Sequence, residues 1–247
     1  MRLLDLEGRK ILVTGASSGI GRSVAVLASD MGASLVLCAR DQQRLEETRT
    51  MLCNQDKHIC VPFDVKVFDG YEDVFGQAVS DGVKLDGLVH CAGVAPVIPL
   101  RSMKPSAITE TMDTNFTSFM YLMAMYAKRK YSNGGSAVAI SAANAHYPQK
   151  CMSVYAASKA ALEAAVKTLA LELAAQNIRI NCVIPGATNT SMMGDLNEDS
   201  KKAIEARQLL GVAEPEDVAN MIAFLLSDAS SMVTGRAMYV DGGMLGY

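Results

Sequence analysis

The sequence predicts a doubly wound α/β fold, a single domain in which about seven parallel strands form one sheet with helices on both faces. Short apolar runs alternate with helical patterns along nearly all of the 247 residues. The runs are apolar on both faces, as strands covered by helices on each side must be. No repeat, low-complexity stretch or linker divides the chain, so we expect one domain over residues 1–247.

Seven segments have the pattern of such strands, at residues 10–14, 34–39, 58–63, 86–91, 136–141, 179–184 and 236–240. Between the first two, apolar residues recur at helical spacing from Ile20 to Met31, and Gly32 supplies a helix stop. A strand, a helix and a second strand repeated in this order give right-handed crossovers. We therefore expect the strands to run parallel.

Two expected helices, at residues 111–131 and 153–175, are apolar on nearly all sides. A helix that cannot turn one face to water must be buried on two sides. Either these helices lie deep in the core or their outer faces form a subunit interface, and we favour the interface. The sequence thus predicts a homodimer or a homotetramer.

The composition excludes several classes of function. Half of the residues are hydrophobic, 20% are charged and the net charge is -3, so there is no basic footprint for nucleic acid. No apolar run approaches the roughly 20 residues that span a bilayer, and acidic residues interrupt the N-terminal segment where a signal peptide is apolar. Six scattered cysteines indicate reduced thiols, and the three histidines lack the spacing of metal ligands. We expect a cytoplasmic protein with no membrane, nucleic-acid or metal partner.

The first expected strand leads into a glycine-rich turn, TGASSGIGR at residues 14–22. Gly15 would permit the tight turn, Gly19 would leave room for a pyrophosphate, and Gly21 would let the next helix pack close to the sheet. The free amides and the dipole of that helix start attract phosphates. The glycine spacing differs from the usual dinucleotide fingerprint, but its position after the first strand predicts a dinucleotide site.

The end of the second strand is where the adenosine ribose is usually bound. Ala39 stands where an acid would accept from the ribose hydroxyls, and Arg40 follows it. Because a guanidinium pairs well with a 2′-phosphate, this favours NADP(H), with NAD(H) as a possible second coenzyme. The alternative is a solvated arginine paired with a neighbouring acid. Asp64, after the third strand, could accept from the adenine amine or simply cap a turn.

Tyr155 and Lys159 lie one turn apart on the same face of the expected helix at 153–175. A phenol with a pKa of about 10 is a poor acid or base at neutral pH. A neighbouring ammonium favours the phenolate and lowers that pKa, so that a proton could pass between Tyr155 and a substrate oxygen. The alternative is a plain charge ladder that continues through Glu163 and Lys167.

These motifs occur together in one order: the turn at 14–22, Asn115, Ser141, YAASK at 155–159 and Pro185-Gly186. The combination resembles the short-chain dehydrogenase/reductase family, whose compact members consist of about one Rossmann domain. The resemblance covers nearly the entire chain, from Leu6 to Gly243. Its general pattern is similar to the 3-oxoacyl-(acyl-carrier-protein) reductase branch.

The resemblance implies a catalytic set of Asn115, Ser141, Tyr155 and Lys159. Tyr155 would donate or accept the proton, Lys159 would bind the nicotinamide ribose, and Asn115 would hold a water of the proton relay. A serine on the fifth strand would bind the carbonyl oxygen. The implied coenzyme-binding residues are Gly15, Ser17, Ser18, Gly19, Ile20, Gly21, Arg40, Asp64, Val65, Ala92, Gly93, Asn115, Tyr155, Lys159, Pro185, Gly186 and Thr188.

Two departures from the family pattern matter. Cys91 replaces an asparagine whose main role in the family is to tie the sheet together. We expect this replacement to affect the local stability of the sheet more than the catalytic reaction. The family's serine usually lies 13 residues before the tyrosine, where this chain has Ala142, whereas Ser141 lies 14 before it. A slip of one residue on a regular strand would turn the side chain to the opposite face. We favour Ser141, because irregular backbone after the strand end can absorb one residue; Ser153 or a site without a serine is the alternative.

The implied reaction is the reversible NADP(H)-dependent reduction of a ketone to a secondary alcohol, with a small carbonyl or alcohol compound as substrate. Residues 187–211 would form a lid over that substrate. Met192, Met193, Leu196 and Leu209 would give the lid an adaptable apolar lining, although they could equally pack it onto the body.

Other readings of the function stay open. The basic run Lys128-Arg129-Lys130 could meet an acidic carrier protein that bears the substrate, or merely favour a helix C-terminus. The enzyme could instead be an NAD-dependent polyol or steroid dehydrogenase. A catalytically weak regulatory protein that binds the coenzyme is the alternative from another class.

Overall fold

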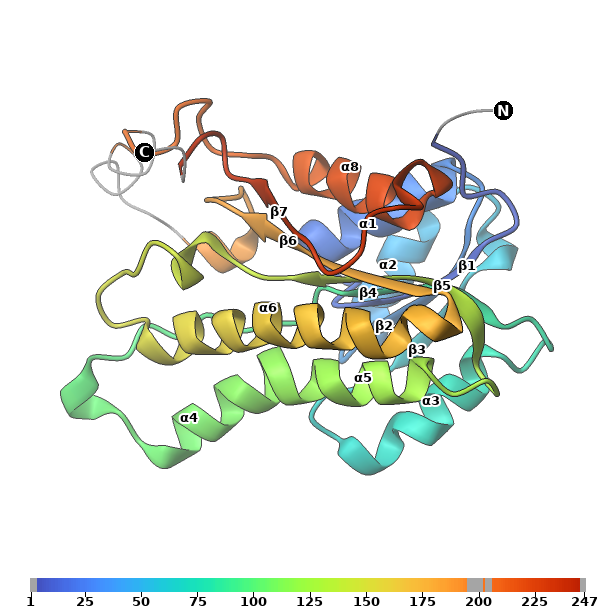
Figure 1. The fold of residues 1–247 in the computed structure, drawn as a ribbon, viewed down its shortest axis with the longest axis horizontal. Helices are drawn as coiled ribbons and strands as arrows, with labels where there is room; N and C mark the ends of the chain where they lie inside the picture. The colour runs from blue at the N-terminus through green and yellow to red at the C-terminus, as the bar shows by residue number, and fades with distance from the viewer. Residues whose placement is uncertain (1–3, 195–201, 203–205, 245–247) are drawn as a thin grey trace.

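The computed structural model describes residues 4–194, 202 and 206–244, and its centre is one parallel sheet of seven strands (Figure 1). The spatial order of the strands is β3-β2-β1-β4-β5-β6-β7, and every neighbouring pair is parallel. The strands are β1 (Lys10–Thr14), β2 (Ser34–Ala39), β3 (Ile59–Pro62), β4 (Leu85–His90), β5 (Ser132–Ile140), β6 (Ile178–Pro185) and β7 (Ala237–Val240). The predicted doubly wound sheet is confirmed, with strand ends shifted by a few residues.

Helices cover both faces of the sheet, in the two layers visible in Figure 1. One layer holds α1 (Gly19–Asp30), α2 (Gln42–Thr50) and α8 (Pro215–Leu226). The other holds α3 (Tyr71–Ala78), α4 (Pro105–Met112), α5 (Ser118–Tyr126) and the long α6 (Ser153–Leu173). The connections that carry these helices run over one face or the other of the sheet and return the chain to the edge where each parallel strand begins.

The apolar strands separate two hydrophobic cores. Within β1, Leu12 packs into the core beneath α3, α5 and α6, whereas Ile11 and Val13 pack beneath α1 and α8. All three side chains are at most 1% exposed. Successive side chains of a strand point to opposite faces, so both faces must be apolar when both are covered.

The segment at 111–131, which the sequence predicts as one helix, is interrupted. Helix α4 ends at Met112, a π-helical turn spans Asp113–Thr117, and α5 begins at Ser118. Asn115 lies in this wide turn and is fully buried. A π-helical turn shifts the side chains that follow it around the helix axis and is frequent at functional sites.

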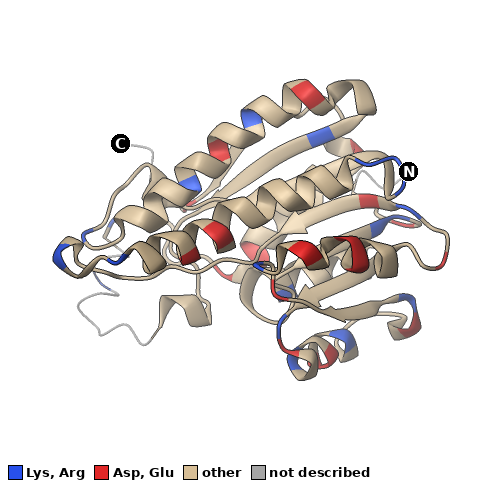
Figure 2. Ribbon diagram, turned by 90° about the horizontal axis from the view of Figure 1, so that it is seen from below, with Lys and Arg blue, Asp and Glu red and all other residues tan. Residues whose placement is uncertain are grey.

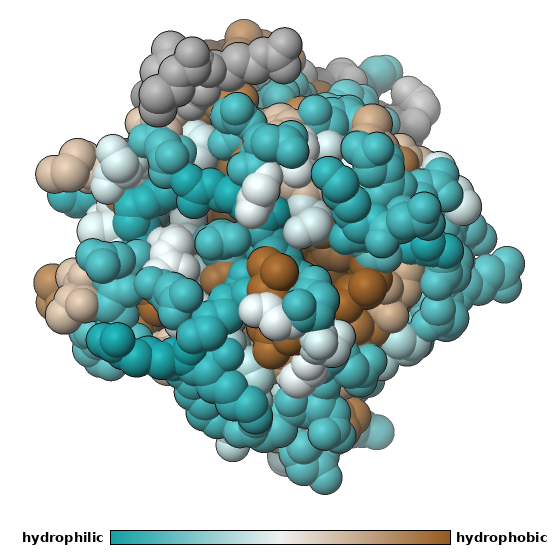
Figure 3. All heavy atoms as spheres, turned by 90° about the vertical axis from the view of Figure 1, so that its right-hand side faces the viewer, coloured by the Kyte–Doolittle hydropathy of each residue, from teal (hydrophilic) through white to brown (hydrophobic). Residues whose placement is uncertain are grey.

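Charged residues of both signs are spread over the elements that Figure 2 shows, without a large patch of one sign. Figure 2 shows positive and negative residues alternating along α6. The side of the molecule on the right of Figure 1 is mostly hydrophilic, with its apolar residues gathered near the centre (Figure 3). Among the described residues, no helix is both long and apolar enough to cross a membrane.

Candidate active site

A large cavity of about 1300 Å³ lies at the carboxyl ends of the strands. Strand β1 lies between β2 and β4 in the sheet, so the chain changes direction there and opens a crevice, as in other doubly wound folds. The cavity runs from the glycine-rich turn to the segment after β6, and its volume exceeds what one drug-sized ligand usually occupies. It therefore has room for a dinucleotide and a second small molecule.

The glycine-rich turn forms one wall of this cavity. A Cβ on Gly15 would lie 2.8 Å from the amide nitrogen of Ala92, and a Cβ on Gly21 would lie 2.3 Å from the carbonyl oxygen of Gly15. These two glycines let the turn, β4 and α1 pack closely. Gly19, with a φ of +50°, begins α1 at the cavity, and no side chain caps the helix start. Its amides are thus left for an anionic group, which fits a pyrophosphate.

The far end of the cavity carries two arginines. Arg40 and Arg44 both line it, and neither makes an ion pair within the described part of the chain. The neighbouring acid, Asp41, caps α2 by accepting from the amide nitrogen of Arg44 at 3.1 Å. Two arginines without an ion pair therefore lie at this end of the cavity. The sequence interpretation missed Arg44, although its spacing of four residues from Arg40 places it in the first turn of α2.

Three more expected coenzyme residues lie along the same wall. Asp64 and Val65 line the cavity after β3, and the carboxylate of Asp64 accepts from the amide nitrogen of Lys66 at 3.0 Å. Ala92 lines the cavity after β4, and its amide donates to the Oγ1 of Thr14 at 3.3 Å.

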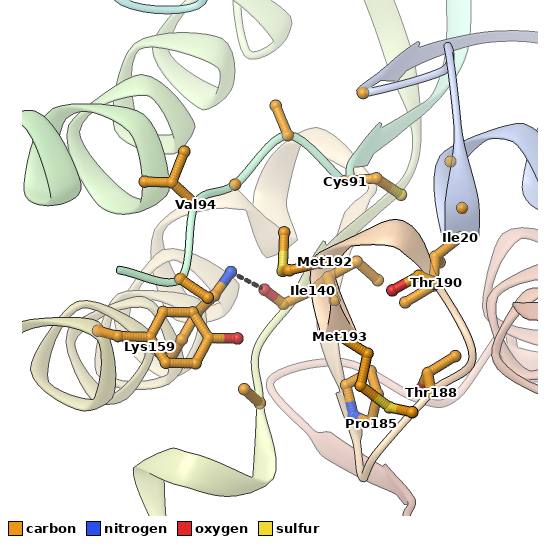
Figure 4. A pocket seen from close by; sticks show the side chains of 18 of the residues that line it. Ile20, Cys91, Val94, Ile140, Lys159, Pro185, Thr188, Thr190, Met192 and Met193 are labelled. Carbon is orange, nitrogen blue, oxygen red and sulfur yellow. Dashed lines mark hydrogen bonds between the residues drawn. The ribbon is translucent and has the colours of Figure 1, made fainter. Parts of the chain in front are cut away.

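The side chain of Lys159 is buried and is not part of an exposed row of charges along the helix. Its Nζ donates to the carbonyl oxygen of Ile140 at 2.7 Å, as Figure 4 shows, and lies 5.9 Å from the centre of the Tyr155 ring. Lys167, two turns further along α6, is exposed. Burial lowers the pKa of Lys159 from 10.5 to about 8.

Tyr155 lines the cavity and is 9% exposed. Burial raises the pKa of its phenol from 10.0 to about 12. The expected lowering of this pKa by the Lys159 ammonium is therefore absent from the structure, because desolvation of the phenolate outweighs an ammonium that is turned to a main-chain carbonyl. At neutral pH the phenol holds its proton, which suits it to donate rather than to accept.

Asn115 acts as a clamp beside this pair. Its Oδ1 accepts from the amide of Val94 at 2.8 Å, and its Nδ2 donates to the carbonyl oxygen of Val94 at 2.9 Å and to the Oγ of Ser158 at 3.0 Å. A Cβ on Gly93 would lie 3.3 Å from the Oδ1 of Asn115 and 3.5 Å from the Nζ of Lys159. The π-helical turn thus brings Asn115 to the segment after β4 and next to Lys159. Asn115 is fully buried and, unlike the other predicted coenzyme-binding residues, does not itself line the cavity.

Ser141 lines the cavity, but its hydroxyl is bound to a buried carboxylate. The side chain is 2% exposed, and its Oγ donates to the Oε1 of Glu163 at 2.5 Å. The Nε2 of His146 lies 2.9 and 3.1 Å from the two oxygens of the same carboxylate. Ala142 follows in extended conformation, with φ -161° and ψ 150°, and lines the cavity. That Ser141 holds the substrate carbonyl stays a prediction, and Ser153 is exposed at the start of α6.

The replacement of an asparagine by Cys91 leaves the sheet well tied. The Oγ1 of Thr14 lies 2.9 Å from the Nδ1 of His90, and the Nε2 of His90 lies 3.3 Å from the Oγ of Ser118. Backbone pairing continues through Cys91, whose amide donates to the carbonyl of Thr14 at 3.2 Å. Burial lowers the pKa of His90 to about 3, so this bridge between β1, β4 and α5 is neutral.

The segment after β6 closes the other side of the cavity, where Pro185, Thr188, Met192 and Met193 are seen in Figure 4. Gln208, which sequence reasoning missed, anchors it: the Oε1 accepts from the amide of Ala187 at 2.9 Å and the Nε2 donates to the carbonyl of Ala187 at 3.1 Å. Gln208 is fully buried.

The expected lid residues have different surroundings. Met192 and Met193 line the cavity, whereas Leu209 is 64% exposed and does not line it. Leu196 and part of the expected lid at 187–211 lie outside the described residues.

Comparison with known proteins finds relatives that match nearly the whole chain. The family model described as Enoyl-(Acyl carrier protein) reductase matches residues 15–245. The chain is 34% identical over 248 residues to D-erythrulose reductase of Gallus gallus, with 98% of each chain covered. It is 32% identical over 246 residues to 3-oxoacyl-(acyl-carrier-protein) reductase of Rickettsia felis, with 98% of this chain and 99% of the relative covered.

Among solved structures, the chain is similar to the short-chain glucose/ribitol dehydrogenase from Brucella melitensis. The TM-score is 0.93 at 28% identity, and 98% of each chain is covered. Both the sequence and the fold thus match over nearly their full length. The chain belongs to the short-chain dehydrogenase/reductase family, whose members are oxidoreductases that interconvert carbonyl compounds and alcohols with a nicotinamide coenzyme.

Proposed function

We propose that the protein is an NADP(H)-dependent reductase that converts a small ketone to a secondary alcohol and back. The observation that carries this proposal is the meeting of Tyr155 and Lys159 in the wall of a cavity, with Asn115 buried behind them. The same cavity is lined by uncapped helix amides and two arginines. Such a cavity fits a dinucleotide along its length and a carbonyl group beside Tyr155.

The chemistry of the site follows from the protonation states of its residues. When bound, the coenzyme supplies the hydride that adds to the carbonyl carbon, and the electron pair of the C=O bond moves to the oxygen. Tyr155 then donates its phenolic proton to that oxygen, which completes the alcohol. Lys159, charged below a pKa of about 8, stabilises the phenolate left behind and binds the ribose hydroxyls. Asn115 holds the backbone after β4 in place and takes part in resupplying the proton through water.

The remaining coenzyme contacts in this proposal follow the cavity wall. Ser17, Ser18, Gly19 and Ile20 surround the pyrophosphate at the start of α1, and Asp64 and Val65 the adenine. Ala92, Gly93, Pro185, Gly186 and Thr188 enclose the nicotinamide end. All eleven of these residues line the cavity.

The preference for NADP(H) rests on Arg40 and Arg44. Asp41 also lines this end of the cavity, but it caps α2 and forms no ion pair with either arginine. A 2′-phosphate is the part of the coenzyme that such a pair recognises.

A free ketone is favoured over a substrate on a carrier protein. The relatives include a reductase of a small sugar ketone and one of a carrier-bound 3-oxoacyl group, so both classes are candidates. The basic run at 128–130 is the place for an acidic carrier, but the Nζ atoms of Lys128 and Lys130 lie 2.6 and 3.9 Å from carboxylate oxygens of Glu72. Glu72 offsets part of the charge that a carrier would need.

Turnover measurements test this proposal. Reduction of erythrulose, other sugar ketones, diacetyl and an acetoacetyl thioester is followed by nicotinamide absorbance with NADPH and with NADH. Tyr155→Phe should reduce kcat at least about 10³-fold with an almost unchanged Kd for NADPH, since only the proton donor is removed. Tight NADPH binding without turnover of any ketone would support the regulatory reading instead.

A cytoplasmic location and a single domain over 1–247 complete the proposal. A reducing compartment would keep the six cysteines as thiols.

A further inference from the structure

The substrate carbonyl needs a second hydrogen-bond donor besides Tyr155, and the position where the family has a serine offers none. Ala142 presents a methyl group to the cavity. The hydroxyl of Ser141 has one proton, and it is donated to Glu163 at 2.5 Å. Ser141 also lines the cavity, but its hydroxyl could serve a substrate only by giving up this hydrogen bond to Glu163.

We infer that the side-chain amide of Asn144 supplies this donor, so that Asn144 is a catalytic residue of the reaction proposed above, on which this inference rests. Asn144 lies in the short 3-10 turn Ala143–Ala145, directly after Ala142, and lines the cavity. The side-chain amide has two N–H groups and can therefore offer a donor where Ala142 has none.

The side-chain amide of Asn144 contacts the start of α6 but is only weakly engaged. Its Nδ2 donates to the Sδ of Met152 at 3.4 Å, and Met152 is the residue that precedes α6, three positions before Tyr155. A thioether is a weak acceptor, so a carbonyl oxygen can replace it at little cost. By contrast, the hydroxyls of Thr114 and Thr188, which also line the cavity, donate to main-chain carbonyls.

The turn that carries Asn144 is fixed to α6 by a buried carboxylate. His146, two residues further on, contacts Glu163 at 2.9 Å, and the side chain of Glu163 is 8% exposed. The amide of Tyr147 donates to the carbonyl of Ala143 at 2.7 Å, which closes the turn. A donor is most effective when it is held in place before charge develops on the oxygen. The contact of Ser141 with Glu163 thus has a use: it helps to anchor the turn from which Asn144 projects.

During reduction, the amide of Asn144 keeps its protons. The hydride forms the new C–H bond, the electron pair of the C=O bond passes to the oxygen, and Tyr155 delivers the proton. The hydrogen bond from Asn144 strengthens as the oxygen gains charge, so its effect is on kcat more than on binding.

The experiment measures kcat, KM and the Kd for NADPH with the ketone that the wild-type enzyme reduces fastest. Asn144→Ala should lower kcat about 10²-fold and leave the Kd for NADPH within about twofold. Asn144→Asp, which keeps the shape but has no N–H, should lose as much. Gln149→Ala, in the same loop and also lining the cavity, is the control and should stay within about threefold of wild type.

A rescue variant separates a donor from a merely structural asparagine. Ala142→Ser in the Asn144→Ala background places a hydroxyl where the family has one and should recover at least about tenfold of the lost kcat. Unchanged kcat in Asn144→Ala together with a loss in Ser141→Ala would overturn the assignment in favour of Ser141. If the wild-type enzyme turns over no ketone, the proposed function is wrong and this inference is wrong with it. If the wild-type enzyme reduces a ketone and the Asn144 variants reduce it equally fast, the proposed function stands and only this inference is wrong.

Discussion

Arg40 and Arg44 lie beside an acid that caps a helix, and their coenzyme contacts can be tested separately. Asp41 stands beside Arg40, but its carboxylate caps the start of α2 and no ion pair joins the two within the described residues. Arg40→Ala should therefore raise the Kd for NADPH at least about tenfold, and Arg44→Ala should raise it by a smaller factor, with little effect on NADH. Titration of coenzyme fluorescence measures both. Arg49→Ala is the matched control, because Arg49 lies on the same helix and pairs with Glu46 at 2.7 Å. Equal losses for NADPH and NADH would rule out a contact with the 2′-phosphate.

Lys159 gives the site a pH dependence of definite sign. Burial lowers its pKa to about 8, so the ammonium is present below that pH and is lost as the pH rises through it. Tyr155, with a pKa of about 12, keeps its proton throughout. We expect kcat/KM for ketone reduction to fall above about pH 8. Lys159→Met should remove this step along with most of the activity, whereas Lys167→Met, on the exposed face of α6, should keep the wild-type profile. A profile that is flat to pH 10 would contradict this role of Lys159.

At the scale of elements, the bridge from β1 through β4 to α5 should make stability sensitive to acid. An unfolded histidine takes up a proton as the pH falls through about 6.5, whereas buried His90 resists protonation until about pH 3. Stability is thus lost on acidification through this range, at up to about 1.4 kcal/mol per pH unit. Urea unfolding at pH 7 and pH 5 should show a loss about 2 kcal/mol larger for wild type than for His90→Gln. Equal losses in the two proteins would contradict the assignment.

The sequence predicted elements well where one physical rule dominates. Apolar runs in β1 and β2 could be read as buried strands because both faces are covered, and the glycines at 15, 19 and 21 marked the turn into α1. The π-helical turn at Asp113–Thr117 was not predicted, because its residues fit a regular helix equally well. The contact of Asn115 with Val94 that accompanies the turn joins segments about 20 residues apart, which no local pattern reveals. The high pKa of Tyr155 was also missed, since desolvation depends on tertiary burial that a spacing of four residues does not reveal.

For the whole molecule, the outer faces of α5 and α6 support the predicted homo-oligomer. Tyr121 is 45% exposed and Leu171 is 82% exposed, and the intervening outer face of α6 carries small residues such as Ala160 and Ala164. Such a face allows close helix packing between copies. Light scattering should give a dimer or tetramer for wild type and a smaller mass for Leu171→Glu combined with Ala164→Glu. Met51→Glu, at the end of α2 in the opposite layer, should keep the wild-type mass. A monomeric wild type would refute this assembly.

The position of β1 in the sheet has a consequence for biosynthesis. Its one neighbour, β2, follows within about 20 residues, but its other neighbour, β4, is completed only at His90. A nascent chain therefore exposes an open edge and half of an apolar layer until much later segments leave the ribosome. Pairings between distant segments slow folding and prolong exposure to aggregation. This strand order therefore leaves the first half of the chain exposed to misassociation during synthesis for longer than an order in which each strand pairs with the next.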